Sequence, residues 1–198
     1  MNLLVVRRSA SSPSHRISIM KTIIQSIRAV LVLTVLTGII YPVLFTLFSQ
    51  AAFHATANGS LVREGDKLRG SALLAQKSES PQYFWPRPSA GDFATVASGA
   101  SNKGPTSVDL IKSIAERREK FGAGAPGDLL TASGSGLDPH VTPEAAHFQA
   151  VRVAAARKLP LEKVNALVSQ YTEGPQWGIF GEPRVNVFAL NRALGAPQ

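Results

Sequence analysis

The chain has 198 residues, no cysteine and a formal net charge of +8, from 21 Lys and Arg against 13 Asp and Glu. Without cysteine it has no disulfide, no thiolate metal site and no cysteine nucleophile. Five of the positive charges precede residue 29, so residues 49–198 keep 16 basic and 13 acidic residues, a net of only +3. This near-neutral balance does not indicate a nucleic-acid-binding domain, and we expect no nucleic acid as a partner.

An uncharged run of twenty residues, 29–48, predicts one transmembrane helix. At 1.5 Å per residue, such a helix spans about 30 Å, the thickness of the hydrocarbon core of a bilayer. Residues 1–28 carry only basic charges, which the positive-inside rule places in the cytoplasm. We therefore expect a cytoplasmic basic tail, disordered over residues 1–19, and a single-pass protein of the cell inner membrane with residues 49–198 in the periplasm.

A cleaved signal peptide is the alternative, with Ala55-Thr56-Ala57 as a cleavage site. Apolar cores of signal peptides have about 7–15 residues, so the longer run, which also contains Pro42, favours a retained anchor. Pro42 is tolerable if a Thr side chain or a neighbouring helix satisfies the backbone group that it frees. Small residues predict a face that another helix can approach closely. This candidate face for packing in the membrane is Thr34, Thr37, Gly38 and Pro42.

Residues 49–198 suffice for one domain, for which the pattern predicts a mixed fold of the α+β or α/β type. A polar connector is expected over residues 51–70, and residues 78–104, rich in Pro, Gly and aromatic residues, predict an ordered loop. Helices are predicted over residues 107–121, 142–158 and 160–171, with caps at Ser107 and Thr142. Strands are predicted over residues 68–74 and 184–188.

The segment 131–140 (TASGSGLDPH) is the place to look for a nucleophile, because it holds hydroxyls, an acid and an imidazole. A membrane-anchored periplasmic hydrolase using Ser135, or Ser133, with His140 is therefore the alternative function. Residues so close together in one Gly-rich loop rarely converge as a triad, so side-chain bonds to the loop backbone are the simpler interpretation.

Metal and nucleotide sites are not indicated either. His140 and His147 are seven apart, without the ligand spacing of a metal-binding helix. The glycine-rich segment 122–127 lacks the Lys-Ser/Thr of a phosphate-binding loop, and the chain contains no Asp-Lys-Thr-Gly-Thr motif for an aspartyl phosphate. The residues alone thus predict a single-span protein with no catalytic or metal site, whose external domain serves a partner.

Several motifs carry a family resemblance. They are residues 57–62 (ANGSLV), 69–76 (RGSALLAQ), 83–84 with 87–90, 97–102 (ASGASN), 131–140 continuing to residue 157, and 181–187 (GEPRVNV). In this order they resemble the C subunit of the bacterial Kdp potassium-transporting P-type ATPase, over about residues 28–194. Residues 1–19 extend beyond the usual start of that family, and Trp85-Pro86 is inserted before Arg87.

The resemblance implies an accessory subunit of a heteromeric potassium uptake pump, not an enzyme in itself. Its partners would be a channel-like subunit, an ATP-hydrolysing subunit and a small membrane peptide. The family's C subunit is described as needed for assembly and as a catalytic chaperone that raises ATP affinity; ATP binding is thereby implied, without residues to assign. We expect the domain to brace the channel-like subunit externally. Candidate partner-contact residues are Tyr83, Phe84, Arg87, Ser133, Ser135 and Asp138.

Overall fold

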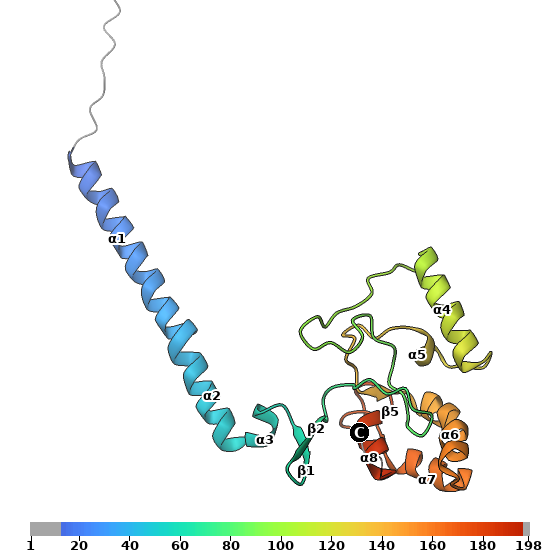
Figure 1. Cartoon of the computed structure of the whole chain (residues 1–198). Coiled ribbons are helices and arrows are strands. Elements are labelled where there is room, and N and C mark those ends of the chain that lie inside the picture. The colour runs from blue at the N-terminus through green and yellow to red at the C-terminus, as the bar shows by residue number, and fades with distance from the viewer. Residues whose placement is uncertain (1–12, 196–198) are drawn as a thin grey trace, which may run out of the picture. The chain divides into compact units, whose positions relative to one another are not determined.

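A computed structural model describes residues 13–195, in two compact units, 1–58 and 59–198, that are treated separately below. In the first unit, helix α1 (Pro13–Val35), a π-helical turn η1 (Leu36–Ile40) and helix α2 (Tyr41–Ala52) follow one another without a break (Figure 1). The backbone of residues 13–19 is therefore helical, in contrast with the disorder expected there, while residues 1–12 lie outside the described part. The short helix α3 (His54–Ala57) ends this unit.

The stretch Ile19–Ala52 is long and apolar enough to cross a membrane, the one such helix among the described residues. It exceeds the expected span 29–48 at both ends, because the helix continues through Lys21 and Arg28 on one side and past Phe48 on the other. Residues 19–48 are all exposed within this chain. The protein is thus a mixed helix and sheet domain with a single N-terminal membrane anchor, as the sequence predicted.

Pro42 is accommodated by the π-helical turn that directly precedes it. The Tyr41 N–H donates to the Leu36 carbonyl, five residues earlier, and this wider turn gives the proline ring room where an α-helix would clash. The Thr37 hydroxyl donates to the Leu33 carbonyl at 2.7 Å. The threonine thus bonds one turn earlier in the helix, and local π-helical geometry is what tolerates the proline.

The second unit opens with an antiparallel hairpin of β1 (Leu61–Glu64) and β2 (Lys67–Ser71). Its two-residue loop has Gly65 at φ +59°, the Gly-X type that hairpins favour. The connector expected over residues 51–70 was thus wrong in its second half, which is β1 and most of β2. The strand expected over 68–74 begins and ends earlier.

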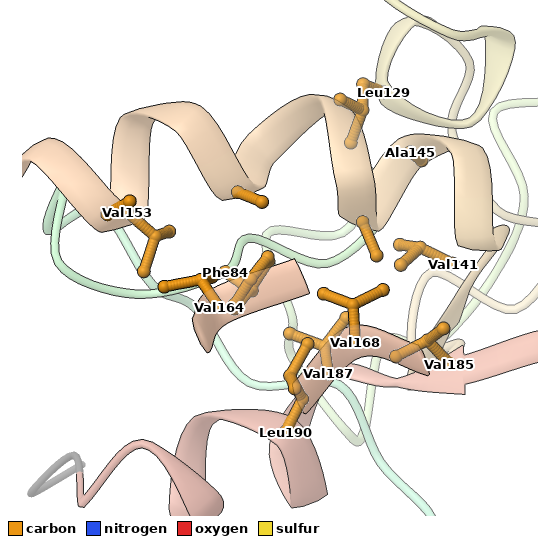
Figure 2. Packing of buried hydrophobic residues seen from close by; sticks show 13 residues of the cluster. Phe84, Leu129, Val141, Ala145, Val153, Val164, Val168, Val185, Val187 and Leu190 are labelled. Atoms are coloured by element: carbon orange, nitrogen blue, oxygen red, sulfur yellow. The ribbon is translucent and has the colours of Figure 1, made fainter. Parts of the chain in front are cut away.

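The remaining elements form the body of the domain. They are α4 (Val108–Phe121), α5 (Gly127–Leu130), β3 (His140–Val141), α6 (Pro143–Arg157), α7 (Leu161–Gln170), β4 (Thr172–Glu173), β5 (Arg184–Asn186) and α8 (Val187–Ala193). The sheet is antiparallel with strand order β3-β5-β4. Helices α6, α7 and α8 pack with this sheet around a core of mainly Val, Ala and Leu side chains (Figure 2).

Local signals located the three long helices well. Thr142 caps α6, since its hydroxyl accepts from the Ala145 N–H at 3.2 Å. Ser107 precedes α4 as expected but makes no side-chain cap bond. The strand expected over 184–188 ends at Asn186, whose side chain accepts from the Ala189 N–H at 3.0 Å and so begins helix α8. Val187, which lies inside the predicted strand, is the first residue of α8 and is buried.

Candidate functional site

Two loops of the second unit interlock and carry most of the candidate residues. We call residues 78–104 the aromatic loop and residues 131–140 the serine loop. The Ser133 N–H donates to the Pro88 carbonyl at 3.0 Å, and the Ser98 hydroxyl donates to the Ser135 carbonyl at 2.7 Å. The two loops therefore form one surface, although some forty residues separate them in the chain.

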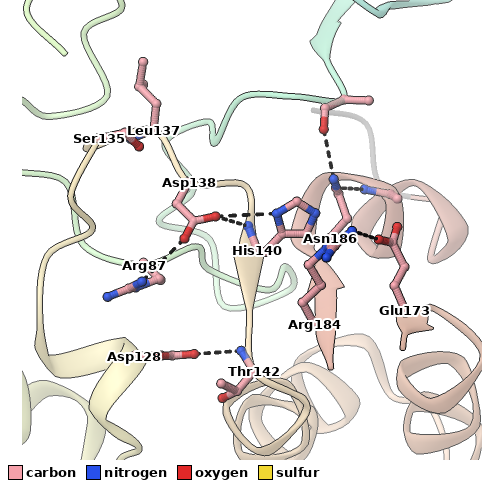
Figure 3. Close-up of polar contacts among 12 residues, drawn as sticks. Arg87, Asp128, Ser135, Leu137, Asp138, His140, Thr142, Glu173, Arg184 and Asn186 are labelled. Atoms are coloured by element: carbon pink, nitrogen blue, oxygen red, sulfur yellow. Dashed lines mark hydrogen bonds and ion pairs between the residues drawn. The ribbon is translucent and has the colours of Figure 1, made fainter. Parts of the chain in front are cut away.

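Asp138 joins both loops to strand β3 (Figure 3). Its Oδ2 lies 3.4 Å from Arg87 Nη1, and its Oδ1 accepts the His140 backbone N–H at 3.0 Å and lies 3.5 Å from His140 Nδ1. All three side chains are about 70% buried. The structure thus brings together Arg87 and Asp138, two of the predicted contact residues, as an internal brace at the start of the sheet.

The serine loop needs glycine at one position. Gly136 has φ +71°, and a Cβ there would lie 3.0 Å from the Gly99 carbonyl oxygen and 3.1 Å from Ser89 Oγ. The glycine therefore permits both the left-handed backbone and the close approach of the aromatic loop.

The serines do not form a nucleophile and base pair with His140. Ser133 is buried, and the Ser135 hydroxyl accepts the Leu137 N–H at 3.0 Å, a local loop bond. Among the described residues neither serine hydroxyl bonds to His140, whose ring lies beyond Asp138 from Ser135 (Figure 3). The geometry therefore gives the hydrolase alternative no support.

The aromatic loop is fastened to the core by two buried amides. Asn191 accepts the Phe84 N–H at 2.8 Å and donates to the Phe84 carbonyl at 3.0 Å. Gln149 likewise accepts the Trp85 N–H at 2.8 Å and donates to the Trp85 carbonyl at 3.0 Å. Both amides are 1% exposed and Phe84 is fully buried. Internal packing thus accounts for Phe84, and likewise for Ser133, so these two predicted contact residues do not reach the surface; Tyr83 and Ser135 do.

Two cations lie over the Trp85 ring. Arg152 Cζ is 3.9 Å and Lys120 Nζ 4.7 Å from its centroid, and Phe121 meets the ring edge-on. Arg152 also donates to Gln149 Oε1 at 2.8 Å, and its burial lowers the pKa of the guanidinium to about 10, which leaves it charged at neutral pH. This cluster attaches the end of α4 to α6.

Two residues of the predicted face for packing in the membrane, Thr34 and Gly38, lie on the same side of the helix. A Cβ added at Gly38 would meet Thr34 Cγ2 at 4.0 Å, so these two residues share a face. Apart from the backbone of the helix itself, no other atom of the described chain lies within 4 Å of that Cβ. The helix thus has room for a Cβ at this position.

The described part of the chain contains no arrangement of side chains suited to a metal or a nucleotide phosphate. No group of three or more His, Asp or Glu side chains is placed to hold a metal there. Segment 122–127 runs from the end of α4 to the first residue of α5, and it lacks the Lys-Ser/Thr that a phosphate-binding loop needs.

Comparison with known proteins decides the family. The model of the family described as KdpC, K+-transporting ATPase, c chain, matches residues 23–196. The chain belongs to this family. It is 49% identical over 176 residues to the potassium-transporting ATPase KdpC subunit of Methylococcus capsulatus, covering 84% of this chain and 93% of that protein. The KdpC subunit of Polynucleobacter asymbioticus is 46% identical, with coverage of 88% and 98%. The resemblance seen in the sequence motifs is confirmed.

The family motifs have structural explanations in this chain. Within residues 131–140, Gly136 and Asp138 hold the two loops together. Within 181–187, Asn186 caps α8 and donates to the Ala72 carbonyl at 2.9 Å, which ties the hairpin's end to the sheet. Sequence reasoning missed the amides Gln149 and Asn191, because a polar residue on a helix gives no sign that it will be buried.

Proposed function

We propose that this chain is a noncatalytic subunit of a high-affinity, ATP-driven potassium uptake complex, needed for its assembly. The observation that carries the proposal is the family match over residues 23–196, together with a membrane-length helix on which residues 19–48 are exposed. A lone helix of this kind has a small face at Thr34 and Gly38 available for another membrane helix. The relatives are named as potassium-transporting ATPase subunits, which supports a pump as the assembly.

The partners in this proposal are a channel-like potassium subunit, an ATP-hydrolysing subunit and a small membrane peptide. The basic residues before position 29 favour an N-terminus in the cytoplasm and a C-terminal domain in the periplasm of a cell with an inner membrane. In that orientation the domain braces the channel-like subunit near its external mouth. Ser135, which is exposed, and Tyr83, which is half-buried, remain candidates for this contact.

The chain raises the ATP affinity of the catalytic subunit indirectly in this proposal. An external domain cannot touch cytoplasmic ATP, and the described residues offer no phosphate-binding loop. The effect would pass through the membrane helix or through subunit packing, as a coupling between distant sites.

Potassium-dependent ATP hydrolysis tests this role. We expect complex purified without this chain either to dissociate or to show a KM for ATP raised by about 5-fold or more, the lower end of typical coupling between distant sites. Adding back the full chain should restore the lower KM. An intact complex with an unchanged KM in the absence of the chain would contradict the proposal.

Thiol labelling tests the topology, because the chain has no cysteine of its own. Cysteines are placed singly at Ser11, outside the described residues, and at Ser169, exposed on α7. In intact cells a membrane-impermeant reagent should label Ser169→Cys and leave Ser11→Cys unlabelled until the cells are opened. The reverse pattern would invert the topology and remove the external brace.

A further inference from the structure

The connection between β4 and β5 exposes three large apolar side chains close together. Trp177 is 82% exposed, Ile179 78% and Phe180 59%. We call residues 174–181 (GPQWGIFG) the aromatic turn; they contain no charged residue. Single exposed apolar residues are ordinary, but a cluster that includes a largely exposed Trp indicates an interaction surface.

The aromatic turn has a defined backbone. The Gln176 N–H donates to the Phe180 carbonyl at 2.7 Å and the Phe180 N–H donates back at 3.0 Å. Trp177 has φ +55° and Gly178 φ +76°. A Trp in the left-handed region is strained, and the rest of the turn must offset that strain. The Trp177 and Phe180 rings meet edge to face, with centroids 6.1 Å apart.

The turn is also fixed at its base. Glu173 and Arg184 face each other across β4 and β5 and form an ion pair of 3.0 Å. The next residue, Val185, is fully buried in the core. An ordered apolar projection on a rigid sheet loses little entropy on binding, which is the property of an anchor for a protein pocket.

The charges around the turn indicate which kind of surface it binds. Arg184 neutralises Glu173, which leaves Glu182 without an ion pair among the described residues. The only base in residues 173–184 is thus already engaged. Residues 173–184 thus lack the cluster of Lys and Arg that binds anionic lipid headgroups. A protein pocket with apolar walls and a basic residue at its rim complements it in both respects.

We propose that the aromatic turn inserts into an apolar, basic-rimmed pocket on a partner subunit of the potassium ATPase complex. The identity of the partner as a subunit of that complex rests on the proposed function. Trp177 and Ile179 fill the pocket, and Glu182 pairs with the base at its rim. The membrane helix and the turn are then two separate attachments to the assembly.

The test uses the full chain with the other subunits, in competition with tagged wild-type chain during assembly. The double variant Trp177→Ala, Ile179→Ala should compete at least about 30-fold less well, the size of a hot-spot loss. The control is Val108→Ala, Ile111→Ala on α4, two apolar residues that are also exposed, and it should compete as wild type. Glu182→Lys should compete less well than Glu182→Gln, since it places a base against a base.

The outcomes separate the two proposals. If the turn variant competes as well as wild type while wild type itself assembles, the turn inference is overturned and the subunit role stands. If wild-type chain does not assemble at all, the proposed function falls first. Trp85→Phe leaves Trp177 as the single tryptophan of this chain, and the difference between complexes with and without a further Trp177→Phe change gives the fluorescence of Trp177. Quenching of that difference by brominated lipids would assign the turn to the bilayer and overturn the inference. We expect the fluorescence of Trp177 to be the same in brominated and in ordinary lipid.

Discussion

Replacing Gly38 with Leu should reduce the recovery of partner subunits with this chain by about tenfold or more, equivalent to 1.4 kcal/mol of association free energy. The reason is intermolecular. Apart from the helix backbone, a Cβ at Gly38 meets only Thr34 Cγ2, at 4.0 Å, within the described chain, and Leu favours a helix more than Gly does. The variant helix should therefore form normally and be held away from a neighbouring helix by the bulk of its new side chain.

Two further variants calibrate this result. Gly38→Ala, the smallest increase in volume, should retain most of the partners, and Leu33→Ala on another face should change little. Co-purification in detergent is the measurement, and the KM for ATP of whatever complex survives shows whether the membrane contact carries the coupling. Equal recovery of Gly38→Leu and Leu33→Ala would mean that the small face is incidental.

Gln149→Leu should lower the stability of the folded domain by about 2–4 kcal/mol, because three hydrogen bonds are lost and their partners stay covered. The amide accepts from the Trp85 N–H and from Arg152 Nη2, both at 2.8 Å, and donates to the Trp85 carbonyl at 3.0 Å. Arg152 forms no ion pair among the described residues, so it has no carboxylate to replace this partner. The melting temperature of the full chain in detergent should fall by about 6–15 °C.

The matched control is Gln170→Leu, the same substitution on a helix at an exposed position at the end of α7. It should change stability by no more than about 0.5 kcal/mol. Gln149→Glu keeps the two accepted bonds and loses the donated one, so it should fall between the two. Melting curves of Gln149→Leu and Gln170→Leu that coincide would show that the amide does not fasten the aromatic loop.

The sequence by itself determined the features that depend on local signals. The apolar run predicted the membrane helix, and caps, glycines and periodic apolar residues located α4, α6 and α7 to within a residue or so, because these interactions act within one turn of a helix. The family followed from motifs long enough to be specific. Strands β2 and β5 overlap predicted strands, whereas β1, β3 and β4, of two to four residues, had no such signal, since so short a stretch shows no clear alternation.

Burial was decided only by the tertiary structure. The chain has two uncharged aromatic clusters of similar composition, at residues 83–85 and 177–180. Their sequences alone predict the same tendency to be buried. The first cluster is largely buried, because Asn191 and Gln149, distant in sequence, form hydrogen bonds with its backbone and Phe84 lies in the core. The second pairs its backbone with itself, Gln176 with Phe180, and Trp177 stays exposed. Whether an aromatic residue is core or surface depends on contacts made across the fold, and these are absent from any local pattern.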